Sequence, residues 1–408
     1  MKPLGLLYLT GILRERGHFV RLIDSMDRKF PDLAQMKEGS YGRGEFYSLY
    51  LEKPAPLRNI PRNYKLYGLP PDQLEELLIE ENQNYDYIIL TSGMTYWYQG
   101  LKETSQLLKK IYPDTPIILG GIYATLLPDH ASKNISFDYL VRGGFKGLEK
   151  LIGIKIPSFS NWPAPDYSDY EEPGYAVVRS SRGCKNSCPF CGIKMIFPGF
   201  DFKEAVFLRE KIRVFKDTRS IENIVFYDDD LLASPGFKDY LKDPVLGVKI
   251  HTPNGLDPEK LDPETGELFR RAGVIDPCVS ADILSAAGEK SMQKHSQDLI
   301  ERSISSLRSA GYRPGEYSTY IIGGLPNQDM NLLEHDVRFL HETGARVRIA
   351  EYSPVPGTST ASVLPKELME EPLLHNNSLY PALKKADIIR FQNIKKIAST
   401  LNGRFNQK

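Results

Sequence analysis

Six short apolar runs in the second half of the chain constrain its fold more than any other feature. Helical patterns separate the runs, which recur about every 25 to 45 residues, a spacing typical of successive βα units with parallel strands. Six units rather than eight predict an open, partial (β/α)6 barrel. The runs occupy residues 176–179, 224–227, 248–251, 279–282, 319–322 and 346–351.

Polar residues, glycines or prolines follow each of these runs. Because the carboxyl ends of parallel barrel strands share one rim, where active sites form, we expect the following segments to meet at one site. The first segment is rich in cysteine, and the other five are Asp228-Asp229-Asp230, Pro253-Asn254-Gly255, Ser285-Ala286-Ala287, Gly323-Gly324-Leu325-Pro326 and Pro354-Val355-Pro356-Gly357.

The segment after the first run holds three of the four cysteines, at Cys184, Cys188 and Cys191. Four cysteines are too few for a disulfide scaffold in a chain of 408 residues, so their clustering indicates a metal. Three thiolates leave one iron of a four-iron cluster open to a further ligand, and soft all-sulfur ligation favours iron and sulfide over zinc. Zinc, or no metal, is the alternative, although Cys278 lies far off for a fourth ligand of structural zinc.

Helix and strand patterns alternate along residues 1–153, which predicts a doubly wound, Rossmann-like parallel sheet. The predicted helices are residues 4–16, 71–81 and 100–112, and the predicted strands are residues 18–24, 85–91, 116–119 and 137–142. Residues 25–68 are polar, rich in Tyr and Pro and without a clear period, so they predict an insertion or lid.

The prolines of residues 154–174 predict an interdomain linker, and the sequence predicts a barrel domain over residues 175–363 and a helical tail over residues 364–408. Lys plus Arg equals Asp plus Glu at 52 each, so no bulk positive charge favours nucleic acid or an anionic membrane. No apolar run approaches the roughly 20 residues that span a bilayer. We expect a cytoplasmic protein that acts on a small molecule or a peptide.

The cysteine segment resembles the three-cysteine signature of the radical S-adenosylmethionine (radical SAM) superfamily. The resemblance implies that Cys184, Cys188 and Cys191 hold a 4Fe-4S cluster and that Phe190, in the usual aromatic place, shapes its pocket. It also implies that the amino and carboxylate groups of S-adenosylmethionine chelate the open iron. One-electron reduction, by a donor such as ferredoxin or flavodoxin, then splits a carbon–sulfur bond to give a 5'-deoxyadenosyl radical.

The same resemblance extends to the segments after the later runs. Asp228 and Asp229 stand where the family contacts the methionine amino group, and a solvated acidic turn is the alternative. Ser280-Ala281-Asp282 is similar to the Gly-x-Glu segment whose carboxylate holds the cofactor ribose, with the shorter Asp282 in place of Glu.

Two further segments resemble the family's adenine-side turns. Gly323 and Gly324 stand in a Gly-Leu-Pro turn beside the adenine, where glycine lets the backbone approach a ligand. Pro354 belongs to a Pro-x-Pro-Gly-Thr segment that closes the sixth unit, with a plain barrel turn as the alternative. His251 and Asn254 follow the third run and could face the substrate, as could His375-Asn376-Asn377, although a single histidine is more often structural.

The N-terminal region resembles the cobalamin-binding module of one branch of this superfamily, through residues 3–9, 89–92 and 118–125. The resemblance implies that Ser92, Gly120 and Gly121 meet the nucleotide tail of the corrinoid; otherwise the Gly-Gly pair merely turns the chain. No Asp-x-His-x-x-Gly motif occurs, so any cobalamin should be base-off without a histidine ligand from that motif. Met94, Thr95 or Tyr96 could then approach its lower face.

Two departures qualify the N-terminal resemblance. Residues 142–147 lack the acidic residue usual after the last strand, and the chain opens on a helix where the module begins with a central strand. A sheet without that strand would leave an edge unpaired. We therefore expect that the natural reading frame starts upstream, or that this variant has lost function in this domain.

The reaction expected from these resemblances is cobalamin-dependent methyl transfer to an unactivated carbon. A radical rearrangement or cyclisation without methyl transfer is the enzymatic alternative. A non-catalytic sensor that binds only the cluster or the corrinoid is the alternative from another class.

Overall fold

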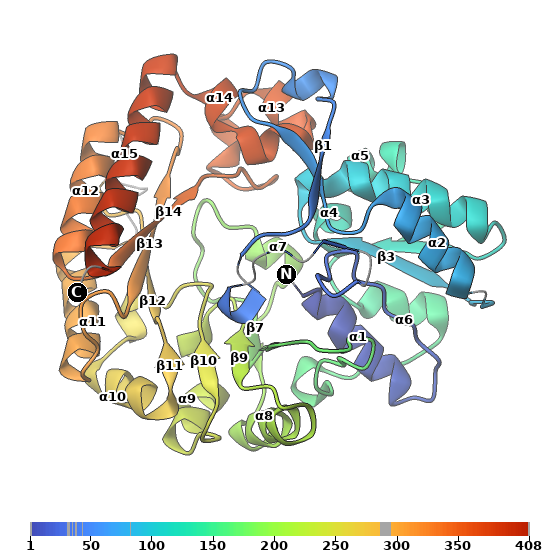
Figure 1. Ribbon diagram of the computed structural model, residues 1–408, viewed down its shortest axis with the longest axis horizontal. Helices are drawn as coiled ribbons and strands as arrows, with labels where there is room; N and C mark the ends of the chain where they lie inside the picture. The colour runs from blue at the N-terminus through green and yellow to red at the C-terminus, as the bar shows by residue number, and fades with distance from the viewer. Residues whose placement is uncertain are drawn as a thin grey trace.

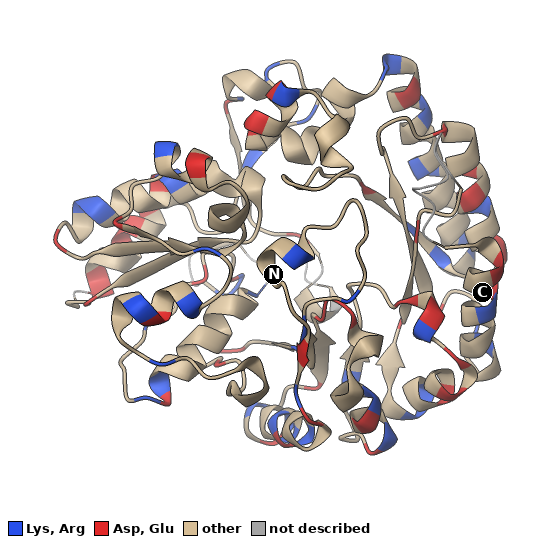
Figure 2. Ribbon diagram, turned by 180° about the vertical axis from the view of Figure 1, so that it is seen from behind, with Lys and Arg blue, Asp and Glu red and all other residues tan. Residues whose placement is uncertain are grey.

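The computed structural model describes residues 2–30, 33–34, 36, 39–42, 44–81, 83–285 and 295–406. Figure 1 shows the N-terminal elements on one side, and strands β9 to β14 in an arc with helices outside it on the other. Acidic and basic residues intermingle on the outer helices (Figure 2). Among the described residues, no helix combines the length and apolarity needed to cross a bilayer.

A parallel sheet forms the centre of the N-terminal part, with strand order β3-β4-β5. Its strands are β3 (Ile88–Ser92), β4 (Ile117–Gly120) and β5 (Tyr139–Leu140). All three coincide with runs predicted to be strands, although β5 is shorter than its run.

Helices cover both faces of this sheet because the side chains of β4 alternate. Ile117 packs with leucines of α2 (Pro71–Glu81) and α3 (Tyr98–Ile111). Ile118, on the other face, packs with Leu9 and Leu13 of α1 (Leu4–Arg14) and Leu148 of α6 (Lys146–Ile152). A strand buried on both faces explains the continuous apolar run in the sequence. Two short helices, α4 (Gly121–Leu126) and α5 (Pro128–Asn134), follow β4 directly.

The strand predicted over residues 18–24 is wrong, because this described segment carries no strand. Its polar groups bind side chains instead of a neighbouring strand. Arg21 pairs with Glu81 and Asp169, and the Leu22 N–H donates to the Asp169 carboxylate at 3.3 Å. An alternating pattern becomes a strand only where a neighbour completes the hydrogen-bond ladder.

The described part of residues 25–68 contains a hairpin that the sequence pattern did not predict. Strands β1 (Ser48–Leu51) and β2 (Tyr64–Tyr67) pair in antiparallel register. Most of their side chains are exposed or half-buried, so the alternation of apolar and polar residues that marks a half-buried strand is missing. A 3-10 turn, η1 (Ser40–Gly42), precedes the hairpin.

All six apolar runs of the second half form strands, as predicted. Four parallel strands form one sheet in the order β11-β10-β9-β6, and three form another in the order β12-β13-β14. Leu256 joins the two sheets by a parallel bridge to Val279. The strands are β6 (Ala176–Val178), β9 (Asn223–Phe226), β10 (Lys249–His251), β11 (Val274–Ile275), β12 (Cys278–Asp282), β13 (Ser318–Gly323) and β14 (Arg346–Glu351).

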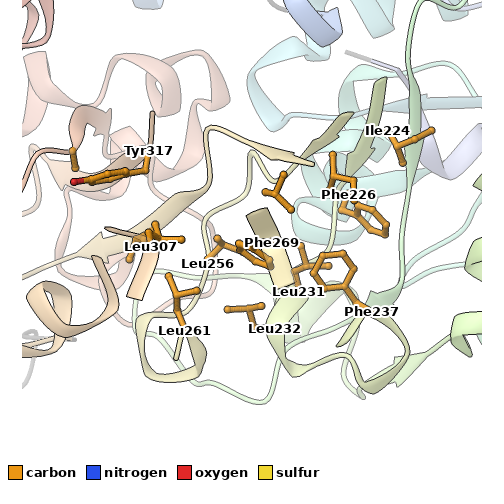
Figure 3. Close-up of a cluster of buried hydrophobic side chains, with 14 of the residues drawn as sticks. Ile224, Phe226, Leu231, Leu232, Phe237, Leu256, Leu261, Phe269, Leu307 and Tyr317 are labelled. Atoms are coloured by element: carbon orange, nitrogen blue, oxygen red, sulfur yellow. The ribbon is translucent and has the colours of Figure 1, made fainter. Parts of the chain in front are cut away.

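Helices pack on the outer side of these sheets around one large apolar core (Figure 3). Phe226 of β9 points into this core against Phe237 of α9, with ring centroids 4.8 Å apart. Asp262 and Ser296 begin α10 and α11 by accepting backbone N–H bonds, which satisfies donors that a helix start leaves open. The helices are α8 (Ala205–Arg219), α9 (Pro235–Lys242), α10 (Pro263–Ala272), α11 (Gln297–Ser309) and α12 (Met330–Glu342).

The tail is helical, as predicted, and returns to both halves of the chain. Phe391 of α15 (Lys385–Gly403) lies in the large core beside β13, and Leu373 of η9 (Pro372–Asn377) packs in the core of the N-terminal part. Two short helices, α13 (Lys366–Glu370) and α14 (Leu379–Ala382), complete the tail. The tail therefore holds the two halves together at one end of their strands.

Candidate cluster and cofactor site

The three clustered cysteines lie on a loop that closes on itself after β6. Strand β7 (Ser181–Arg182) enters the loop and pairs with β8 (Asp201–Phe202), which leaves it. Gly183 has a φ of +80°, and a Cβ there would lie 1.8 Å from the Gly199 oxygen. The loop therefore requires glycine immediately before Cys184.

The cysteine side chains lie near one another without forming a disulfide. Cys184 and Cys188 are half-buried and Cys191 is exposed. Burial raises the pKa of the Cys184 thiol, opposed by the Asn186 N–H that donates to its sulfur at 3.4 Å, and Asp230, Cys188 and Cys191 raise it further. Within the described part of the chain, no three His, Cys, Asp or Glu side chains are arranged to hold a metal ion. The donor set suits an iron–sulfur cluster, but its thiols are not closed around a common point.

Asp228 supports the base of this loop. Its carboxylate is 2% exposed and accepts four hydrogen bonds from two serines. They come from the N–H and hydroxyl of Ser180, at 3.2 and 2.6 Å, and from the N–H and hydroxyl of Ser181, at 2.5 and 2.8 Å. Burial raises the pKa of Asp228 to about 6, against the lowering effect of these bonds. Both oxygens are engaged, so the structure gives Asp228 a structural role at this site.

The next two carboxylates also bind the cysteine loop. Asp229 receives both guanidinium nitrogens of Arg179, at 3.2 and 3.3 Å, and the N–H of Gly183 at 2.8 Å. Asp230 lies 3.8 Å from the Cys184 sulfur through Oδ2. Its other oxygen, Oδ1, is buried and has no hydrogen-bond partner among the described residues. Asp230 is thus the member of the triplet with an oxygen left for a ligand.

An apolar cluster at the rim joins the cysteine loop with residues that follow β12, β13 and β14. Phe190 of the cysteine loop packs with Ile283 after β12, Leu325 after β13 and Tyr352 after β14. These three aliphatic and aromatic side chains are buried, and Phe190 is half-buried. One aromatic ring therefore connects the cysteines with three of the other rim segments.

The segment after β14 also contacts the cysteine loop directly. The Thr360 N–H donates to the Pro189 oxygen at 3.1 Å, and a Cβ on Gly192 would lie 2.5 Å from Val355. Pro354 is buried within this segment. The first and last rim segments therefore meet, although they lie far apart in the sequence.

Asp282 is the last residue of β12, and Gly323 is the last residue of β13, directly before Gly324. Asp282 ends β12 with a φ of +47° after a register shift in the ladder, a conformation uncommon for residues other than glycine. A Cβ on Gly323 would lie 2.3 Å from Phe391, and one on Gly324 would lie 2.1 Å from Leu379. Close packing of the tail therefore requires both glycines, a reason that the sequence motif did not show.

His251 and Asn254 have structural partners in this arrangement. His251 is 2% exposed, and its Nε2 lies 2.9 Å from the Asn223 Oδ1. Asn254 donates to the main-chain oxygen of Asp228 at 3.0 Å. These contacts favour the structural alternative for His251. Of the Ser285-Ala286-Ala287 segment, only Ser285 lies within the described residues.

The residues expected to face a corrinoid lie at the carboxyl ends of β3 and β4. The Ser92 hydroxyl donates to the Met94 oxygen at 2.8 Å. Gly121, next to Gly120, has a φ of +88°, and a Cβ on it would lie 2.0 Å from the Thr91 hydroxyl oxygen. Helix α4, which Gly121 begins, contacts α7 (Ile193–Ile196) directly after the cysteines. This edge of the N-terminal sheet therefore faces the cysteine loop.

Residues of the tail contact the segment that follows the carboxyl end of β3. The Thr95 hydroxyl lies 2.9 Å from Nδ1 of the buried His375, whose Nε2 lies 3.3 Å from the Met369 oxygen. Because a carbonyl only accepts, Nε2 carries the hydrogen and Nδ1 accepts from Thr95. Met94 and Tyr96 are half-buried beside this bond.

Several residues around the site were missed by reasoning from the sequence. Asp257 and Lys260 follow β10. Asp257 accepts a hydrogen bond from Asn186 of the cysteine loop, and Lys260 pairs with Asp230. Tyr41 covers His251. The sequence signal for Asp257 and Lys260 was their position shortly after the rim segment Pro253-Asn254-Gly255. Their spacing did not indicate that they contact the cysteine loop or Asp230.

Comparison with known proteins supports the assignment made from the cysteines. Residues 178–340 match the family model of the radical SAM superfamily. No curated protein matches the chain in sequence.

Two solved structures of TsrM, a radical S-adenosylmethionine methyltransferase from Kitasatospora setae, share the fold. The one with cobalamin and a 4Fe-4S cluster bound has a TM-score of 0.59 at 15% identity, over 71% of this chain and 66% of that chain. The one with a tryptophan substrate and an S-adenosylmethionine analogue has a TM-score of 0.59 at 14% identity, over 71% and 67%. The chain thus spans about two thirds of the length of TsrM.

The strand that leads into the three cysteines, the rim segments that meet at Phe190 and the family match over residues 178–340 agree with one another. Residues 178–340 form a radical SAM domain.

Proposed function

We propose that this chain is a cobalamin-dependent radical SAM methyltransferase that methylates an unactivated carbon of a small molecule or peptide. Cys184, Cys188 and Cys191 hold a 4Fe-4S cluster, which when bound supplies the electron that cleaves S-adenosylmethionine. A ferredoxin or flavodoxin is the electron donor. The observation that carries the proposal is the rim cluster, in which Phe190 joins the cysteine loop to three other rim segments.

The seven parallel strands of the second half, with the bridge at Leu256, are interpreted as the partial barrel of residues 175–363. S-adenosylmethionine then lies at its rim, beside Phe190. Asp230 takes the ammonium contact in place of Asp228 and Asp229, because a buried oxygen of Asp230 lacks a partner among the described residues. A carboxylate there suits an ammonium group by charge and by hydrogen bonding. Asp282 remains the candidate for the ribose, at the end of β12.

The N-terminal sheet of residues 1–153 is the proposed cobalamin module. Gly121 begins α4, which contacts the helix that follows the cysteines, so a corrinoid over Gly120 and Gly121 would face the cluster. Similarity in fold to a cobalamin-bound TsrM supports this placement. The Thr95 hydroxyl engages Nδ1 of His375, so this nitrogen would not be free to bind a corrinoid held at the ends of β3 and β4.

The experiment is a product analysis of protein purified without oxygen from cobalamin-fed cells. Corrinoid content is measured by absorbance and mass spectrometry, and 5'-deoxyadenosine and S-adenosylhomocysteine are measured after addition of S-adenosylmethionine and a strong reductant. We expect near-stoichiometric corrinoid and both products, and the C184A variant should give no 5'-deoxyadenosine.

Two other results would point to the alternatives. Production of 5'-deoxyadenosine without corrinoid or S-adenosylhomocysteine would replace methyl transfer by a rearrangement or cyclisation. Bound cluster or corrinoid without 5'-deoxyadenosine under strong reduction would make the chain a sensor.

A further inference from the structure

A network of charged side chains connects Cys184 with the segment after β10. The Asp230 Oδ2 lies 3.8 Å from the Cys184 sulfur and 2.8 Å from the Lys260 Nζ. Lys260 also binds Asp257 at 2.6 Å. Asp257 in turn accepts from the Asn186 side chain at 3.3 Å, and the N–H of Asn186 donates to the Cys184 sulfur at 3.4 Å. The network therefore reaches this sulfur by two routes.

Burial strengthens the electrostatic interactions among the charged groups of this network. The Asp230 side chain is 3% exposed, Asp257 is 8% exposed and Lys260 is 27% exposed. Burial disfavours the charged form of Lys260, but its hydrogen bonds to both carboxylates outweigh this and raise its pKa, so it remains an ammonium. Because both distances are measured to the same Asp230 oxygen, the ammonium lies within about 7 Å of the sulfur, where charges interact strongly in a poorly solvated site.

A carboxylate beside a thiolate is unfavourable unless a positive charge compensates it. Asp230 lies against the sulfur of a residue proposed to bind a cluster as thiolate, and reduction adds one more negative charge there. Within the described residues, Lys260 is the cationic side chain that pairs with Asp230. Net charge and hydrogen bonds to sulfur are among the factors that set the reduction potential of an iron–sulfur cluster.

We propose that Lys260, held between Asp230 and Asp257, is a positioning residue that raises the reduction potential of the cluster bound at Cys184. This inference rests on the proposed function, since it requires a cluster on the three cysteines. Lys260 acts by its charge through Asp230, and through Asp257 it fixes the Asn186 N–H on the Cys184 sulfur.

Substitutions at the two ends of the ion pair should shift the potential in opposite directions. The K260M variant loses the positive charge and should be harder to reduce. A roughly tenfold smaller equilibrium constant for one-electron reduction corresponds to a fall of about 59 mV. The D230N variant loses the negative charge beside the sulfur and should be easier to reduce by a similar factor. The K260R variant keeps the charge and should stay close to the unsubstituted protein.

The test is a redox titration of the reconstituted protein without S-adenosylmethionine, followed by electron paramagnetic resonance. The K110M variant is the matched control, because Lys110 pairs with Glu75 on exposed helices of the N-terminal part and should not move the potential. A structural role of Lys260 would change cluster content or thermal stability but would not give shifts of opposite sign.

The possible results distinguish failure of this inference from failure of the proposed function. If the unsubstituted protein binds no cluster, the proposed function and the inference both fail. If it binds a cluster and the K260M and D230N potentials equal that of the control, only the inference fails. If the K260M variant binds no cluster, the reduction potential of the D230N variant tests the inference. A raised potential supports the role of the charge pair, and an unchanged potential overturns it.

Discussion

The phenol ring of Tyr41 lies against the imidazole ring of His251, with the ring centroids 3.9 Å apart. Tyr41 belongs to the segment of residues 25–68, and His251 ends strand β10. Tyr41 adopts a φ of 45°, which is uncommon for a side chain of this size. The N-terminal insertion therefore reaches the parallel strands of the second half and covers a histidine that the sequence suggested could face the substrate.

Removing the Tyr41 ring should expose His251. In the Y41A variant, the imidazole should react with diethylpyrocarbonate, whereas in the unsubstituted protein it should be protected, because it is 2% exposed. Peptide mass spectrometry measures the modification. The Y50A variant is the control, since Tyr50 belongs to the same segment but is 69% exposed. Equal protection of His251 in Y41A would show that Tyr41 does not cover it in solution.

Loss of the Asp228 carboxylate should weaken the base of the cysteine loop. The D228A variant leaves the N–H groups and hydroxyls of Ser180 and Ser181 without their buried acceptor. We expect the free energy of unfolding to fall by about 3 kcal/mol. Urea denaturation measures the change, and D239A, at an exposed residue paired with Lys242, should change it little. Similar values for both variants would contradict a supporting role for Asp228.

His375 should make the protein less stable in acid. Burial lowers the pKa of His375 to about 4 from its ordinary value of 6.5. Between these two values the unfolded chain binds a proton that the folded chain does not, so stability falls as the pH drops from 6.5 to 4. The loss from this group is of the order of 3 kcal/mol and should be absent in the H375Q variant.

Denaturation at pH 7.5 and pH 4.5 tests this dependence in the unsubstituted protein, in H375Q and in H18Q. His18 is exposed, so H18Q should lose stability in acid as much as the unsubstituted protein does. The same loss in H375Q would assign the acid sensitivity to other groups.

Alanine at Gly324 should displace the tail. Its φ of +87° disfavours a side chain, and the added Cβ would lie 2.1 Å from Leu379. We expect G324A to lose about 3 kcal/mol of stability. In contrast, a Cβ on Gly100, within α3, meets no atom within 4 Å, so G100A should stabilise the helix by about 1 kcal/mol. Chemical denaturation distinguishes the two, and equal effects would place the tail elsewhere.

The sequence was sufficient for the features that depend on local pattern. The six apolar runs of the second half were recognised as strands because each contains enough apolar residues to be identified without knowledge of its neighbours. Residues 18–24 carry a similar pattern but form no strand, since a strand also needs a neighbour that the pattern does not reveal. The β1–β2 hairpin escaped prediction for the opposite reason, because it pairs without burying one face.

The candidate site was predictable in its location but not in its contacts. The order of the motifs was enough to expect that Phe190 and the later rim segments meet. The roles of Asp228 and Asp230 differ through backbone geometry that places Ser180 on one and Cys184 near the other. Such contacts depend on loops from distant parts of the chain, for which a single sequence carries no signal.

The most direct test of the cluster assignment is iron and sulfide analysis of the reconstituted protein, combined with electron paramagnetic resonance of its reduced form with and without S-adenosylmethionine. We expect about four irons per chain and a spectrum that changes when S-adenosylmethionine binds. The C184A, C188A and C191A variants should lose the signal, and C278A, at a buried cysteine in β12, should keep it. Zinc in place of iron, or a cluster that survives loss of any of the three cysteines, would contradict the assignment.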